Sequence, residues 1–528
     1  MVKRGIKSII KKEYLIVFVI FVFGFLIRVW SVTFYNTEIG FDQARDLFAA
    51  TSIFRDHHLA IIGPTAGNNP YLHHGVAWWY FMVSPLIFTK GNPMGVVFVN
   101  VFVNASTIIV VYFFAKDFFR NKYAGIIASI LTAVSYQIIQ YGGWLSNPSP
   151  TIFTVPIFFY ALWKYYNTSK KNYLFITVLF LGFSIEFELF FIYLIPIFLI
   201  LFLFLKMKWP TTKNLLLSII IFLITTSTLV ATEFKNHFMG IKSIFFANKY
   251  LGGTASHQPF VKLFGNFLVS WNSFSDNFSP NNLKIGEIIG IIILLVLIFD
   301  LVKNFKLKKQ RDKILFVVIY FLSPALMFLL GTSNEPWFLI GRPIAIIFAF
   351  TYVLIKVRPK FIVAGVLIAV IFMNLNAIEN VQGQGQTLLD PDLSSIMNYQ
   401  IQVVDYTYKS ANGAHFEINT LTNPLYINAV WGYQYYWYGK NKYQYLPTFA
   451  GGDQLYPYNT LSKPNGSEKF LFLIMDTTNR IPPQYKNNLI DWANENSKLI
   501  EEKMFGGIDV QKRILTQIIL TNKKPAKK

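Results

Sequence analysis

No cysteine occurs among the 528 residues of the chain, so disulfide bonds, thiolate metal sites and cysteine nucleophiles are excluded. Charged residues are also scarce, at 14% of the chain, compared with about 25% in soluble domains. The sequence has no phosphate-binding glycine-rich loop, no Walker pattern and no His-Glu-x-x-His motif. A nucleotide-driven pump is therefore not indicated by this chain alone.

Hydrophobic residues instead dominate, at 53% of the chain with a mean hydropathy of +0.41. Apolar runs long enough to cross a bilayer recur through the first three quarters, which predicts a mainly α-helical, polytopic membrane protein. The first run follows basic residues and has no small-residue cleavage site, so we read it as an uncleaved span. About eleven spans are expected, near residues 14–34, 94–115, 123–141, 150–166, two within 173–205, 214–232, 286–302, 313–331, 341–357 and 361–378.

The formal net charge of +21 raises nucleic acid as a partner, but the distribution of the charge argues against one. Of the 48 Lys and Arg residues, 23 fall in six short segments between apolar runs, which is the positive-inside pattern. We expect a plasma-membrane protein with a cytoplasmic N-terminus. The apolar stretch 75–88 is then an interfacial or re-entrant helix, because a crossing would put later basic segments outside. The basic segments are 3–12, 116–122, 164–171, 206–213, 303–313 and 356–360.

The composition changes after residue 378, where 15 basic and 13 acidic residues nearly balance. We predict a membrane domain over 1–378, with outer loops 35–92 and 233–284, and a small extracytoplasmic α/β domain over 379–528. Expected elements of this domain are a strand at 470–475, a helix at 485–503 and a strand at 510–520. Its aromatic run 431–438 is either core and interface packing or a surface that stacks on sugar rings.

Two groups of carboxylates stand close to apolar runs. Glu38, Asp42 and Asp46 are spaced by four, so a helix there would place all three on one face. Ionisable groups at the membrane often mark functional sites. The alternative is a solvated acidic loop with Arg45 as its counter-ion. A second pair, at positions 186 and 188, interrupts the apolar stretch 173–205 and predicts a turn between two short spans.

The order of these features resembles the GT-C superfamily of membrane glycosyltransferases. The nearest resemblance is to its protein O-mannosyltransferase and aminoarabinose transferase branch, the dolichyl-phosphate-mannose-protein mannosyltransferase-like family. That family has Asp-Glu in its first acidic motif, where this chain has Asp42-Gln43. The resemblance covers about residues 10–360 and rests on Phe41-Asp42-Gln43-Ala44-Arg45, on His74-Gly75 before an aromatic helix, on the basic turn after the second span, and on Gly341-Arg342-Pro343.

The resemblance implies a hexosyl- or pentosyltransferase that moves a sugar from a polyprenyl-phosphate donor to an acceptor on the outer face. Asp42 would be the general base, because the acceptor must lose a proton. Arg342 would stabilise the departing phosphate. Weaker candidates for substrate contacts are Arg45, Asp46, His74 and Lys249.

No cofactor is expected, although a divalent cation on Glu186 and Glu188 is the alternative. Such a metal would favour a lipid-linked oligosaccharide transferase or ligase. A transporter or flippase of lipid-linked glycans is a further reading, but no internal repeat is visible. A scaffold or receptor is a third alternative to the glycosyltransferase. The residues leave open whether the acceptor is lipid, polysaccharide or protein.

Overall fold

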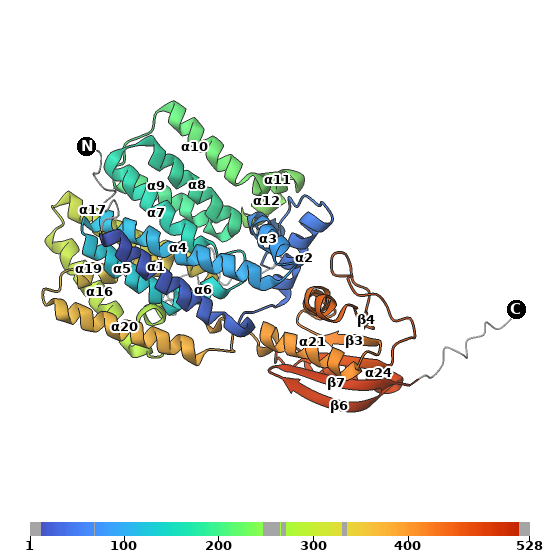
Figure 1. Ribbon diagram of the computed structural model, residues 1–528. Coiled ribbons are helices and arrows are strands. Elements are labelled where there is room, and N and C mark those ends of the chain that lie inside the picture. Colours follow the sequence, from blue (N-terminus) through green and yellow to red (C-terminus); the bar gives the residue numbers. More distant parts are fainter. Residues whose placement is uncertain (1–11, 68, 246–264, 266–270, 330–334, 517–528) are drawn as a thin grey trace, which may run out of the picture. The chain divides into compact units, whose positions relative to one another are not determined.

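The structure is a computed structural model that describes residues 12–67, 69–245, 265, 271–329 and 335–516 (Figure 1). The chain divides into two compact units. The helical unit contains residues 1–31, 59–78 and 97–381, and the sheet unit contains 32–58, 79–96 and 382–528. The sheet unit thus takes in two segments of the first loop, which the sequence assigned to the membrane domain.

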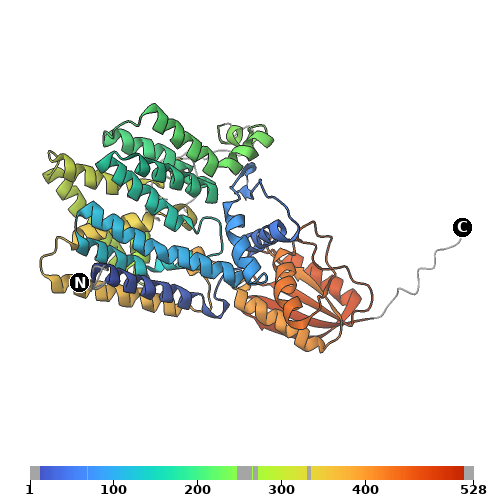
Figure 2. The same cartoon turned by 45° about the horizontal axis from the view of Figure 1, so that its top comes forward.

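Apolar helices make up most of the helical unit, and Figure 2 shows them from a second side. Among the described residues, four helices (α1, α4, α16 and α20) are long and apolar enough to cross a membrane. The number is up to six if α5–α6 and α10–α11 each form one bent span. The elements are α1 (Lys12–Ser31), α4 (Pro93–Phe119), α5 (Lys122–Val134), α6 (Tyr136–Gly143), α7 (Thr151–Thr168), α8 (Lys171–Phe187), η2 (Leu189–Tyr193), α9 (Leu194–Phe204), α10 (Thr212–Thr225), α11 (Ser227–Lys235), α12 (Met239–Phe245), α15 (Ser273–Phe278), α16 (Leu283–Lys303), α17 (Lys308–Leu322), α18 (Ala325–Leu329), η3 (Pro336–Leu339), α19 (Arg342–Leu354), α20 (Lys360–Asn380) and the hairpin β1 (Thr65–Ala66) and β2 (Asn69–His73).

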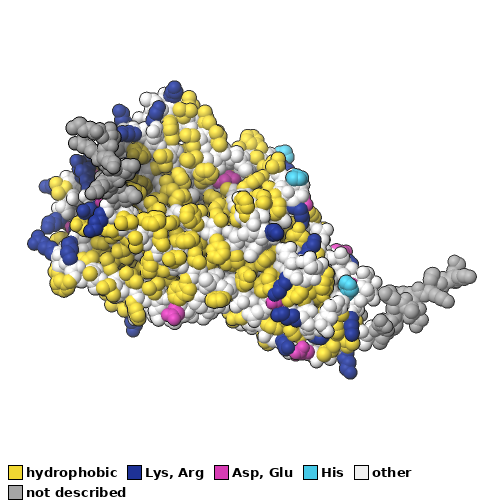
Figure 3. Space-filling model, in the orientation of Figure 1, with side chains coloured by type: hydrophobic (Ala, Val, Ile, Leu, Met, Phe, Trp, Pro, Cys, Tyr) yellow, Lys and Arg dark blue, Asp and Glu magenta, His cyan; other side chains and the backbone are white. Residues whose placement is uncertain are grey.

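Each expected span contains at least one of these helices, and the stretch 173–205 divides into α8 and α9 at the glutamates as predicted. The count of eleven crossings stays a prediction. Figure 3 shows hydrophobic side chains spread over the surface of the helical unit, with Lys and Arg gathered around the end where α17 lies. This separation is the arrangement that the charge pattern predicts.

The third expected span is broken, because α5 and α6 meet at Ser135 with a bend of 54°. The break frees carbonyls at the end of α5, and the buried Arg28 of α1 donates to two of them, Thr132 O at 3.0 Å and Ala133 O at 2.9 Å. Asn374 Oδ1 accepts from the backbone N–H of Tyr136 at 2.7 Å. Side chains from other helices therefore satisfy backbone groups that the apolar interior could not.

The sheet unit is built around five strands in the order β4-β3-β5-β7-β6. Strands β4, β3 and β5 are parallel, and β7 is antiparallel to β5 and to β6. Helix α24 follows the central strand β5 along the chain. The elements of this unit are η1 (Thr33–Tyr35), α2 (Phe41–Arg55), α3 (Ala77–Phe88), η4 (Thr387–Leu389), η5 (Leu393–Ser395), α21 (Met397–Ala411), β3 (Phe416–Leu421), α22 (Ala429–Gln434), η6 (Tyr435–Gly439), α23 (Lys440–Tyr443), β4 (Thr448–Phe449), β5 (Phe470–Asp476), α24 (Pro483–Asn496), β6 (Ser497–Phe505) and β7 (Ile508–Leu515).

Both faces of the sheet are covered. Phe472 and Ile474 of β5 pack in a core with α21 and α22, while Leu471 and Leu473 pack in a second core that includes Ala493 of α24. Burial on both sides explains why β5 is a continuous apolar run. Trp431 of the aromatic run lies in the first core, so the packing interpretation of that residue is confirmed.

The predicted helix 485–503 is wrong over its last part. Helix α24 ends at Asn496, and Ser497–Phe505 forms strand β6. The competing interaction is the antiparallel pairing of β6 with β7, closed by a turn at Gly506, whose φ is +56°. Local helical periodicity is outweighed by this tertiary pairing. The last expected strand is β7, which ends at Leu515, and residues 517–520 of that expectation lie outside the described residues.

Candidate functional site

The acidic motif lies on α2 of the sheet unit. Gly40, with extended φ and ψ of −90° and −165°, is the N-cap, and its N–H donates to Gln43 Oε1 at 3.0 Å. Gln43 therefore caps the helix at the position where the resembled family has a glutamate. Glu38 precedes the helix and forms an isolated backbone bridge with Ile396. The prediction that three carboxylates share one helical face is thus wrong for Glu38, since α2 begins only after Gly40.

Arg45 pairs with two aspartates, Asp42 and Asp46, and the three residues form one cluster. Arg45 Nη1 lies 2.6 Å from Asp42 Oδ1, and Arg45 Nε donates to Asp46 Oδ1 at 2.9 Å. Trp79 of α3 donates its indole N–H to the same Asp46 oxygen at 2.9 Å. The Asp46 side chain is 2% exposed, whereas that of Asp42 is 65% exposed. Asp46 is thus the fixed end of the cluster, and Asp42 is its accessible end.

Burial and neighbouring charges act differently on the pKa values of Asp46 and Arg45. Burial raises the pKa of Asp46, with the charge of Arg45 and the hydrogen bonds from Arg45 and Trp79 acting in the opposite direction. Burial also acts to lower the pKa of Arg45, but Asp46 and Asp42 outweigh it and hold that pKa above its usual range. Arg45 therefore stays positively charged and holds the exposed carboxylate of Asp42 beside it at the surface of α2.

His74, Glu186 and Glu188 meet in the helical unit. His74 Nδ1 lies 3.0 Å from Glu188 Oε1, and Glu188 Oε2 accepts from Asn147 Nδ2 at 2.8 Å. Glu186 Oε1 accepts from the N–H of Val76 at 3.2 Å and from the hydroxyl of Thr228. Both glutamates are buried at the turn between α8 and α9.

The two glutamates have different hydrogen-bond partners and do not form one shared site. A Cβ on Gly75 would lie 2.4 Å from the Glu186 carboxyl carbon, so only glycine allows this close approach. Within the described residues, no group of three or more His, Asp and Glu is arranged to hold a metal ion. The cluster fastens the segment before α3 to the turn between α8 and α9.

Arg342 is the first residue of α19, also in the helical unit, and its side chain is buried. Its guanidinium carbon lies 4.3 Å from the centre of the Phe321 ring. Among the described residues, its Nε and Nη2 have no hydrogen-bond partner. Tyr141 of α6 is within electrostatic range of both Arg342 and Asp276 of α15. Burial raises the pKa of Asp276 to about 7, so this carboxyl group can exchange a proton near neutral pH.

The predicted site residues thus fall into two groups. Asp42, Arg45 and Asp46 come together on α2, while His74 and Arg342 belong to the helical unit. Lys249 lies outside the described residues. Sequence reasoning missed Trp79 and Asp276. The only signal for Asp276 was an isolated acid within the aromatic stretch 271–278.

Comparison with known proteins adds two findings. Residues 73–231 match the family model described as dolichyl-phosphate-mannose-protein mannosyltransferase. The solved structure of ArnT from Cupriavidus metallidurans in the apo state aligns with a TM-score of 0.59 over 94% of this chain and 97% of ArnT, at 11% identity. The chain has an ArnT-like fold.

ArnT bound to undecaprenyl phosphate aligns equally well, with a TM-score of 0.58 at 11% identity and the same coverage of both chains. No curated protein matches the chain significantly by sequence. The GT-C resemblance seen in the sequence is therefore confirmed at the level of fold, and the matched segment 73–231 begins at the histidine pair before α3.

Proposed function

We propose that this protein is a membrane glycosyltransferase that moves a sugar from a polyprenyl-phosphate donor to an acceptor on the outer face of the membrane. The mannosyltransferase family match supports sugar transfer, and the undecaprenyl phosphate bound by ArnT supports a lipid carrier. The apolar helices place the chain in the bilayer, where a carrier with a long hydrocarbon tail is dissolved.

The observation that carries the proposal is that Nε and Nη2 of the buried Arg342 guanidinium have no hydrogen-bond partner among the described residues. Buried cationic N–H groups without acceptors are destabilising, because they have lost their hydration and gained no hydrogen bond in return. A phosphate oxygen supplies both the charge and the acceptors that Nε and Nη2 lack. In the transferase, Arg342 stabilises the negative charge that develops on the departing lipid phosphate.

Asp42 is the general base of the proposed reaction. Its carboxylate is accessible and is oriented by Arg45, which Asp46 and Trp79 hold in place. The acceptor hydroxyl approaches this carboxylate, transfers its proton to it and attacks the sugar carbon that bears the phosphate. In the proposal, Arg45 and Asp46 orient the base, and His74 and Lys249 are secondary candidates for contacts with the donor.

No metal ion is part of the proposal. Glu186 and Glu188 accept hydrogen bonds from Thr228, Val76 and Asn147, so their carboxylates fasten the fold. Transfer that persists in a chelating buffer agrees with this role, and transfer that requires added Mn²⁺ or Mg²⁺ would contradict it.

The proposal is tested by Asp42→Asn in membranes supplied with polyprenyl-phosphate sugars. This change keeps the shape of the side chain and removes the base, so we expect transfer to fall by at least about a hundredfold, the usual contribution of general-base catalysis. The matched control is Asp56→Asn, which changes the acid at the other end of α2, where it pairs with Arg55 at 2.7 Å. Full activity of Asp42→Asn at normal expression would remove Asp42 from the mechanism.

A further inference from the structure

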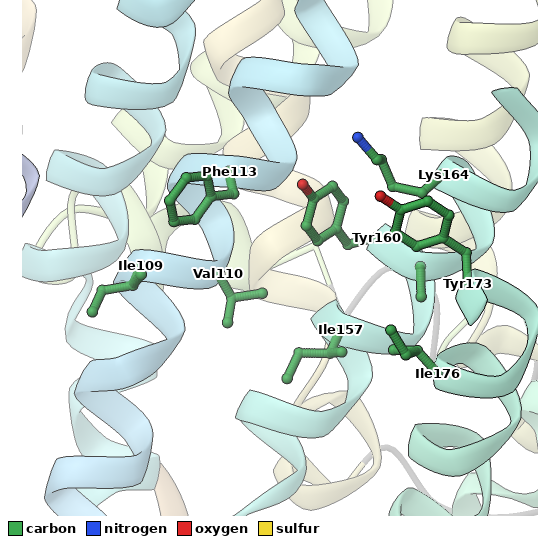
Figure 4. A pocket seen from close by; sticks show the side chains of 9 residues that line it. Ile109, Val110, Phe113, Ile157, Tyr160, Lys164, Tyr173 and Ile176 are labelled. Atoms are coloured by element: carbon green, nitrogen blue, oxygen red, sulfur yellow. The ribbon is translucent and has the colours of Figure 1, made fainter. Parts of the chain in front are cut away.

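Two adjoining hollows lie in the helical unit, away from the residues described above. The first, of about 270 Å³, lies between α4, α7 and α8 (Figure 4). Its wall is apolar and is formed by Ile109, Val110 and Phe113 of α4, Ile157 of α7 and Ile176 of α8. An open hollow lined in this way fits a hydrocarbon chain.

The polar end of the first hollow is formed by Tyr160, Lys164 and Tyr173, which lie together in Figure 4. Lys164 also lines the second hollow, of about 410 Å³, so the two hollows adjoin at this side chain. The second hollow gathers cations from the α4–α5 turn, which are Lys116, Arg120 and Lys122.

These cations are only partly neutralised. Lys164 Nζ lies 2.8 Å from Asp117 Oδ2, and Lys116 Nζ lies 2.8 Å from Glu13 Oε1. Arg120 and Lys122 have no acidic partner within the described residues. Arg120 is moreover close enough to Lys313 of α17 for the two charges to repel each other. The second hollow therefore keeps an excess of positive charge that an anion would neutralise.

We propose that the two hollows form one binding site for an anionic phospholipid, with an acyl chain in the apolar hollow and the phosphate in the basic hollow. Basic pockets between transmembrane helices at a cytoplasmic surface bind anionic lipid head groups. The segment 116–122 is one of the six that the charge pattern places on the cytoplasmic side, where anionic lipids are abundant. The stem of Lys164, which lines both hollows, lies beside the acyl chain while its ammonium group meets the phosphate.

Purified protein in a neutral detergent tests the proposal. Phosphatidylglycerol is expected to raise the unfolding midpoint by several degrees, because a ligand that binds only the folded state stabilises it, while phosphatidylcholine has little effect. Arg120→Gln with Lys122→Gln removes the two unpaired cations and should abolish at least half of the phosphatidylglycerol effect. The matched control is Lys206→Gln with Lys208→Gln, two exposed lysines of the basic segment 206–213, which lines neither hollow, and this variant should keep the full effect.

A second variant tests the apolar hollow separately. Ile157→Trp fills it without changing charge and should also reduce the response to phosphatidylglycerol. The proposal is overturned if the Arg120/Lys122 variant responds as strongly as the parent protein. It is also overturned if only undecaprenyl phosphate stabilises the protein through these residues, since the occupant is then a carrier lipid.

Discussion

Arg28 and Arg342 are both buried in the helical unit, yet their environments differ. Arg28 donates to Asn104 Oδ1 at 2.7 Å and to carbonyl oxygens of Gly24, Thr132 and Ala133. Arg342 leaves Nε and Nη2 without partners among the described residues. Because a buried cation is stable only with acceptors around it, Arg28 stabilises the fold, and the unpaired nitrogens of Arg342 support its proposed contact with a negatively charged ligand.

The substitution Arg342→Gln tests whether Arg342 binds the donor phosphate or, like Arg28, only stabilises the fold. We expect kcat/KM for the lipid-phosphate donor to fall at least about tenfold, since a charge-assisted hydrogen bond contributes roughly 1.5–3 kcal/mol. Arg342→Lys keeps the charge and should recover part of the loss. Arg28→Gln is the control and should lower the unfolding midpoint, because it leaves buried carbonyls unsatisfied. An unchanged kcat/KM in folded Arg342→Gln would exclude this arginine as the phosphate contact.

The limits of sequence reasoning are clear at the residue scale. A spacing of four was enough to predict that Asp42 and Asp46 share one face of a helix, and α2 confirms it. The different environments of these two acids were not predictable. Asp46 is fixed by the indole of Trp79, 33 residues away, and only the packing of α3 on α2 creates that bond.

At the scale of elements, apolar periodicity located the helices but not their breaks. The run 123–141 reads as one span, whereas the structure divides it at Ser135. Ser135 Oγ accepts from the N–H of Ile138 and caps α6, and Arg28 of a different helix supports the end of α5. Such long-range partners leave no local pattern, so sequence alone could not distinguish a straight span from a broken one. Strand β6 escaped prediction for the same reason, since its partner is β7.

Strand β3 carries a titratable group that makes the sheet sensitive to pH. Burial, together with the nearby Glu468, raises the pKa of Glu417 to about 7. The folded state then holds a proton between about pH 4.5 and 7 that the unfolded state has lost. The contribution of Glu417 to stability is therefore full below that window and is lost as the pH rises through 7.

Glu417→Gln should remove this dependence. At pH 8 we expect at least about tenfold greater protection of β3 and β5 amides from hydrogen exchange in the full-length variant than in the parent protein, since one pKa unit is a tenfold change in the equilibrium. At pH 4, below that window, the two should agree, because Glu417 is then mostly protonated in the folded and the unfolded states. Asp453→Asn, at a side chain that is 95% exposed, is the control and should change neither value. Equal protection of the parent and Glu417→Gln at pH 8 would show that Glu417 does not couple the sheet to pH.

At the scale of the whole molecule, the charge pattern sets the orientation of the chemistry. The six basic segments hold 23 of the 48 Lys and Arg residues, and only an orientation with all six inside satisfies the positive-inside pattern. In that orientation residues 35–92 and 379–528 are predicted to face outward, and Asp42 with them. The side of the proposed transfer is therefore predicted from charges that take no part in the proposed reaction.

The absence of cysteine makes this orientation directly testable with single-cysteine variants. In intact cells a membrane-impermeant maleimide should label His57→Cys and Asp453→Cys, both at exposed positions, because both are predicted to be outside. Lys170→Cys, exposed in a basic segment, should react only after the membrane is permeabilised. Labelling of Lys170→Cys in intact cells would show that the orientation is the reverse of the predicted one. Asp42 would then face the cytosol. The proposal of sugar transfer at the outer face would be contradicted, even if the contacts of Asp42 on α2 are as described.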